Sequence, residues 1–86
     1  MNTVFTDNII ELHVPGTVNN TWSVDDGKDI GLRIHYYNGA DQNAALVLAH
    51  DSGALEWYSA GAESTSGNFT SATYGVFKTG AITLTS

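Results

Sequence analysis

Residues 30–37 read IGLRIHYY, which is the clearest alternation of side chains in this sequence. Every second side chain, beginning with Ile30, is apolar or aromatic, whereas most of those between them are polar. Because successive side chains of a strand point to opposite faces, this period of two predicts a strand with one buried face. Asn38-Gly39 follows at once and is a typical two-residue hairpin turn. The stretch therefore predicts antiparallel β structure.

Turn signals recur along the whole chain at a nearly constant interval. They are spaced 11 to 14 residues apart, at Pro15-Gly16, Asp26-Gly27, Asn38-Gly39, Ser52-Gly53, Ser66-Gly67 and Thr79-Gly80. The segments between them are rich in residues that favour strands. Short strands separated by regular glycine turns are typical of antiparallel sandwiches and barrels. We therefore predict one all-β domain over residues 1–86, an antiparallel sandwich or barrel of seven to eight short strands.

The other strands of this sheet follow from the same patterns. They are expected at residues 10–14, 18–24, 44–49, 54–59, 69–77 and 81–85. Asn20 would point inward, which predicts a bulge or a buried amide in its strand. Residues 44–49 are nearly all apolar and fit either a buried strand or a short helix; a strand is favoured because Ser52-Gly53 ends the segment so soon. The expected core residues are Trp22, Leu32, Ile34, Leu46 and Trp57.

The chain is small for a domain that folds without help. A chain of 86 residues buries only about two thirds of its unfolded surface, and such domains usually gain stability from disulfides, a metal or a partner chain. The sequence has no cysteine, which excludes disulfides. Charged residues make up 14% of it, against about a quarter in a typical domain. So few charges favour packing against neighbours, and we expect a homo-oligomer or a subunit bound to a protein lattice.

The charge balance argues against two classes of partner. Three basic residues stand against nine carboxylates, giving a formal net charge of −6. A protein that binds DNA commonly makes about six to ten phosphate contacts, which three cations cannot supply. Neither nucleic acid nor an anionic membrane is therefore expected as a partner. Residues 1–15 lack both a basic start and a continuous apolar run, so no signal peptide is predicted.

Three carboxylates, Asp25, Asp26 and Asp29, cluster around Gly27. Carboxylates at this spacing can share a calcium ion, but the second half of an EF-hand loop is missing. Aspartate is also common in turns, because its side chain bonds to the backbone two residues on. A solvated hairpin turn is the favoured interpretation and calcium binding the alternative. We predict no metal site and no other cofactor.

Residues His50, Asp51 and Ser52 are the three types found in catalytic triads. Consecutive residues cannot align as nucleophile, base and orienting group, because the members of a triad converge from separate segments. His13 and His35 lie on the expected polar faces of two strands and could form a metal pair if those strands were neighbours, although most histidines on strand surfaces are inert. No pair of groups suited to general acid–base catalysis is recognisable. The prediction is a protein that is not an enzyme.

Aromatic residues beside polar turns give the alternative function. The candidate binding residues are Tyr37, Tyr58, Asp41 and Asn43, of which the first, third and fourth flank the Asn38-Gly39 turn in the sequence. A small lectin-like module needs an aromatic ring for a sugar face, with carboxylate and amide groups beside it for the hydroxyls. Both tyrosines are equally suited to a contact between subunits.

Residues 79–85 read TGAITLT, and residues 59–73 are rich in Ala, Gly, Ser and Thr. In composition these segments resemble strands of small phage virion proteins of the head-decoration and fibre type. The resemblance implies a non-enzymatic subunit, located on a virion, that binds a symmetric protein lattice, and it assigns no functional residue. We therefore predict a structural or assembly protein, with a glycan-binding module as the alternative.

Overall fold

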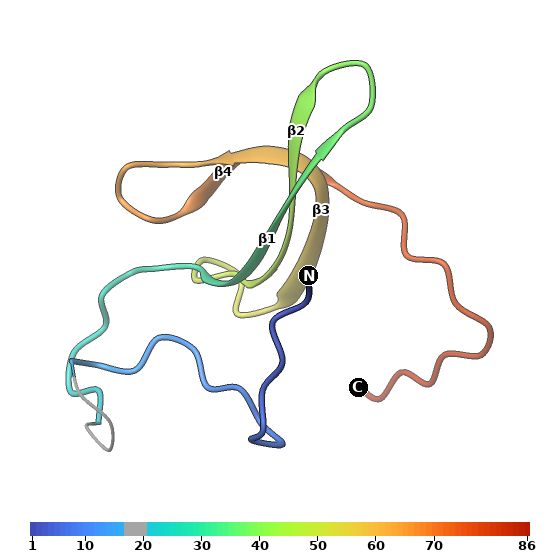
Figure 1. Ribbon diagram of the computed structural model, residues 1–86. Coiled ribbons are helices and arrows are strands. Elements are labelled where there is room, and N and C mark those ends of the chain that lie inside the picture. Colours follow the sequence, from blue (N-terminus) through green and yellow to red (C-terminus); the bar gives the residue numbers. More distant parts are fainter. Residues whose placement is uncertain (17–20) are drawn as a thin grey trace.

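The chain folds around one antiparallel sheet, shown in Figure 1. The computed structural model describes residues 1–16 and 21–86. Its strands are β1 (Ile30–Tyr37), β2 (Asp41–Leu48), β3 (Leu55–Glu63) and β4 (Phe69–Tyr74). They pair in chain order, so each is joined to the next by a hairpin. The all-β class is confirmed, and no helix among the described residues is long and apolar enough to cross a membrane.

The sheet is open and has four strands, in place of the predicted sandwich or barrel of seven to eight. Residues 44–48 are in β2, which settles that segment as strand. Residues 10–14 and 81–85 form no strand, because alternation gives an element only where another segment supplies hydrogen bonds. The bulge predicted at Asn20 lies outside the described residues. Asp26-Gly27 forms no hairpin turn, since no strand precedes it.

The predicted turn positions agree well with the backbone. Five of the six turn glycines have positive φ angles: Gly16, Gly27, Gly39, Gly53 and Gly67. At Gly39 the φ is 92°, a conformation that glycine adopts without steric cost, and this residue reverses the chain between β1 and β2. The regular interval of glycines therefore marks chain reversals even where no strands flank them.

The pairing register gives the sheet two different faces. Leu32 is paired with Leu46, which is paired with Trp57, and directly paired residues point to the same face. We call this side the apolar face; its large apolar residues are Ile30, Leu32, Ile34, Leu46, Leu48, Leu55 and Trp57, and Tyr36, Gln42 and Ala44 lie on the same side. The opposite side, which we call the inner face, carries Arg33, Ala45 and Tyr58.

The core that the chain forms by itself is small and lies on the inner face. Tyr58 and Phe69 pack over Ala45 and Val47, with the two rings stacked at 5.5 Å between centroids. This packing follows from the strong curve of β3 visible in Figure 1, which carries the β3–β4 hairpin across the inner face. Among the described residues no large side chain is completely buried.

The apolar face has no second layer over it. Leu32, Ile34 and Leu46 remain 56%, 48% and 39% exposed, and Trp22 is also exposed. The prediction that these residues are core is therefore wrong for the single chain. The reason is the direction of the curl: the chain covers its inner face and leaves the face richer in leucine and isoleucine open.

The molecule is expanded for its length. Its accessible surface is 7271 Å², whereas a folded monomer of this mass exposes about 4,900 Å². Its radius of gyration is 15.2 Å, against about 12 Å for a folded domain of this size. The segment after β4 runs away from the sheet and the segment before β1 loops below it, as Figure 1 shows. The excess surface therefore comes from the open face and the two flanking segments.

Candidate functional site

A cavity of about 460 Å³ lies where the segment before β1 meets the ends of β1 and β2. Its apolar lining comes from Trp22, Val24, Ile30, Leu48 and Ala49, and its polar lining from His13, Asp25, Asp26, Lys28 and His50. Ile30 and Leu48 also belong to the apolar face, so the cavity is continuous with one end of that face.

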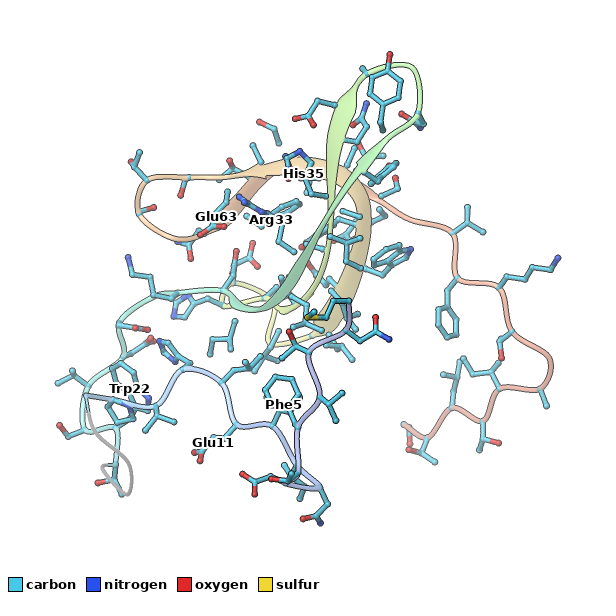
Figure 2. All side chains as sticks on the ribbon, viewed as in Figure 1. Phe5, Glu11, Trp22, Arg33, His35 and Glu63 are labelled. Atoms are coloured by element: carbon cyan, nitrogen blue, oxygen red, sulfur yellow. The ribbon has the colours of Figure 1, made fainter. Side chains whose placement is uncertain are left out.

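The wall of this cavity is held by contacts between His13 and Trp22. Their rings stack with centroids 4.5 Å apart, and the indole Nε1–H of Trp22 donates to the backbone carbonyl of His13 at 2.8 Å. His13 has a φ of 65°, which histidine adopts more readily than most residues. Figure 2 shows Trp22 on the segment that runs below the sheet. The cavity therefore has an aromatic wall.

Two histidine–aspartate pairs form the polar side. His13 Nε2 lies 2.7 Å from Asp26 Oδ2, and His50 Nε2 lies 2.8 Å from Asp25 Oδ2. The hydrogen bond from Asp25 raises the pKa of His50 above 6.5, and the same bond lowers the pKa of Asp25 below 3.8. Adjacent carboxylates thus bind histidines from two different segments, and the rim carries these two carboxylates with one lysine, Lys28, beside them.

The Asp29 carboxylate has a structural role, because it binds the backbone of two other segments. Its carboxylate accepts the backbone N–H of His50 and of Phe69, both at 2.9 Å. Asp25 likewise accepts the N–H of Gly27 at 2.8 Å, which is the turn bond expected of this residue. Within residues 1–16 and 21–86 no group of three or more suitable side chains could hold a metal ion. The three clustered aspartates are therefore engaged with backbone and histidine donors.

The predicted binding residues lie on the inner face, and they do not form one site. Tyr37 is 76% exposed and is paired with Asp41 at the hairpin tip. Asp41 Oδ1 lies 2.5 Å from His35 Nε2, while Asn43 Oδ1 is buried and has no hydrogen-bond partner among the described atoms. Tyr58 is buried, 8% exposed. Only the first three residues are close enough to act together.

Tyr58 belongs to a second polar network on the inner face. Its hydroxyl donates to Glu56, which also accepts the hydroxyl of Ser52 at 2.8 Å and that of Tyr74 at 3.3 Å. These hydrogen bonds lower the pKa of Glu56, and the bond from Tyr58 is the largest cause. The hydrogen bond to the Glu56 carboxylate in turn raises the pKa of Tyr58. Since Tyr58 also stacks on Tyr74, its ring is not a free platform for a sugar.

The fold separates the two histidines that were considered as a metal pair. His13 and His35 bind different aspartates, Asp26 and Asp41, so they do not form the metal pair considered for them. The cavity itself escapes sequence reasoning because its residues come from three segments. A signal was present in the sequence, since the pair Asp25-Asp26 is a natural partner for histidines in a chain with few cations.

No family model, curated protein or solved structure matches this chain. Its function is therefore inferred from geometry. The cavity has an apolar floor and an acidic rim, an arrangement that suits a group with an apolar body and a positive charge beside it.

Proposed function

We propose that this protein is a non-enzymatic assembly subunit that works as a homo-oligomer, built by pairing the apolar faces of two copies. The observation that carries the proposal is the uncovered apolar face of β1, β2 and β3. An antiparallel sheet normally packs one face on a core and presents the other, polar face to water. Here the uncovered face is the apolar one.

The composition of the apolar face supports a stable interface. Leu32 and Leu46 are paired at its middle, and Leu55 at its end is 70% exposed. Interfaces between obligate subunits resemble a domain core cut in half. The apolar face has this character, since it presents core-type leucine and isoleucine side chains without a layer over them. Monomers rarely expose a contiguous apolar patch of this kind without a function in association.

The amount of exposed surface supports the same proposal. The chain exposes roughly 2,300 Å² more than a folded monomer of its mass. A standard interface buries about 800 Å² on each partner, so the excess could cover between two and three such contacts. A second copy carries the same apolar face, and a twofold interface is formed from the same patch on both subunits.

Pairing of the faces also accommodates the predicted sandwich. Two sheets packed face to face lie about 10 Å apart and share one core between them. Two copies with four strands each would give eight strands in two layers. The seven to eight strands expected from the sequence would then be reached by the assembly. We propose the virion as the setting of this subunit, on the compositional resemblance of residues 59–73 and 79–85.

Glycan binding is the second candidate. It is favoured by Tyr37, an exposed ring at the hairpin tip, and by the carboxylate of Asp41 paired with it. A glycan array with Tyr37→Ala as the negative control tests this candidate.

The assembly proposal is tested by mass measurement over a dilution series. We expect a discrete oligomer at micromolar concentration for the unmodified chain and a monomer for Leu46→Asp, which places a charge at the centre of the apolar face. Val4→Asp is the matched control, because Val4 is 82% exposed and lies outside the sheet; it should leave the mass unchanged. An unmodified chain that stays monomeric and folded at every concentration would contradict the proposal.

A further inference from the structure

We infer that residues 75–86 of one copy dock on a second copy, with Phe77 in its cavity and Lys78 against the acidic rim formed by Asp25 and Asp26. This inference rests on the proposed self-association and names the segment that completes it. The occupant of the cavity is thus another molecule of the same chain.

The segment has almost no contact with its own sheet. The N–H of Gly75 donates to the carbonyl of Trp57 at 2.8 Å, and past this point the hydrogen bond found is a local one, from Thr79 Oγ1 to the carbonyl of Ala81. Figure 1 shows the chain leaving β4 and running away from the other strands. Its large apolar side chains are all exposed: Val76, Phe77, Ile82 and Leu84.

Charge divides the chain into two complementary parts. All nine carboxylates lie in residues 1–74 together with Lys28 and Arg33, which leaves that part with a formal charge of −7. Residues 75–86 contain Lys78 and no carboxylate side chain, which gives them +1. A copy of the segment is therefore attracted to the body of another copy, although whole chains at −6 repel each other.

Lys78 is the cation that remains without a partner in the described part of the chain. Lys28 donates to the carbonyl of Ser66, and Arg33 lies 3.2 Å from Glu63, the pair labelled in Figure 2. The cavity matches the sequence Phe77-Lys78 because its lining offers apolar surface, including Trp22 and Leu48, to an aromatic ring, while its edge offers carboxylates to a flexible ammonium.

The position of the cavity also fits an exchange between paired copies. It opens at the end of the apolar face, through Ile30 and Leu48, so a copy stacked on that face brings its own flanking segment close. Twelve extended residues span up to about 40 Å, comparable with the 41 Å longest dimension of the molecule. None of the residues lining the cavity comes from residues 75–86 of the same chain.

The test compares dissociation constants of the full-length chain by sedimentation. The segment variant carries Phe77→Ala and Lys78→Glu, and the cavity variant carries Val24→Lys, a change at an exposed lining residue outside the sheet. Each should weaken self-association about tenfold or more, since a buried aromatic side chain contributes at least that factor. Phe5→Ala, which removes an exposed ring from the other flanking segment, is the control and should have no effect.

Mixing the two variants decides whether docking occurs between copies. A mixed pair keeps one intact segment and one intact cavity that face each other, whereas either variant paired with itself has none. The mixed pair should therefore associate more tightly than both. No gain on mixing would overturn the inference, as would unchanged association in the segment variant or an equal loss in Phe5→Ala. In those outcomes the unmodified chain still assembles; if it does not, the proposed function itself fails.

Discussion

A hydrogen bond between Asp29 and Asn68 joins the start of β1 to the start of β4, the two outer strands of the curled sheet. The backbone N–H of Asp29 donates to Oδ1 of Asn68 at 2.7 Å, and the amide of Asn68 donates to the carbonyl of Gly27 at 3.1 Å. The Asp29 carboxylate returns a bond to the next residue, Phe69. Residues 39 positions apart are thus joined in both directions, which keeps β4 over the inner face.

Loss of the hydrogen bonds made by the Asp29 carboxylate should weaken the packing of the small core. Asp29→Ala leaves the N–H groups of His50 and Phe69 without their acceptor, so we expect the free energy of unfolding to fall by about 1–3 kcal/mol. Urea denaturation at a fixed chain concentration measures the change. Asp51→Asn, at an exposed aspartate in the turn before β3, should shift the midpoint little; an equal shift in both variants would contradict the assignment.

Tyr58 is the central side chain of the chain's own core. Tyr58→Ala removes a ring stacked between Phe69 and Tyr74, and the expected loss is about 3–5 kcal/mol, the range for a large aromatic residue cut to alanine. Tyr58→Phe should cost less, because it keeps the ring and loses the bond to Glu56. Tyr37→Ala serves as control and should be nearly neutral; thermal unfolding compares the three.

The His50–Asp25 pair should make stability depend on pH in a defined direction. The raised pKa of His50 gives a contribution that is complete below pH 6.5 and is lost as pH rises through the raised value. The lowered pKa of Asp25 gives one that is present above pH 3.8 and is lost as pH falls through the lowered value. The pair is therefore strongest in the window between them.

Titration of the imidazole by NMR tests this pairing directly. In Asp25→Asn the pKa of His50 should move down towards 6.5, while Asp26 and Asp29 continue to raise it slightly. Added salt should reduce the shift, because both groups are exposed. An unchanged His50 titration in Asp25→Asn would show that the two side chains are not paired in solution.

Gly31 sets the close approach of β1 to β2. A Cβ at this position would lie 2.1 Å from the carbonyl oxygen of Leu46 and 2.7 Å from the Cα of Val47. Gly31→Ala should therefore push the strands apart and destabilise the fold by about 1–3 kcal/mol. Gly80→Ala is the matched control, since nothing lies within 4 Å of its Cβ position. Denaturant midpoints compare the two, and equal midpoints would contradict the packing described.

The hairpin of β1 and β2 is predictable because its information is local. The alternation from Ile30 to Tyr37 and the Asn38-Gly39 turn together determine the pairing of neighbouring strands. The extension of β3 to Glu63 is not predictable in this way, because Gly61 lies under the ring of Phe69, and a Cβ there would be 2.3 Å from that ring. Tertiary packing overrides the small, polar composition of the segment.

The cavity depends on contacts that no local pattern contains. His50 reaches Asp25 across 25 residues, and that meeting requires the carboxylate of Asp29 to bind the backbone of His50. The sequence could identify aspartates suited to a turn, but it could not place a histidine beside them. The expected strands at residues 10–14 and 81–85 fail for a related reason, since no segment among the described residues pairs with them.

The open apolar face also makes the order of events during synthesis important. In the proposed assembly, a chain that leaves the ribosome presents Leu32, Leu46 and Leu55 to water until a second copy covers them. Exposed apolar surface of this kind makes unassembled chains prone to aggregate when their concentration is high. Under this proposal, chains translated side by side from the same messenger RNA would meet first, and the spacing of ribosomes would affect the yield of assembled protein.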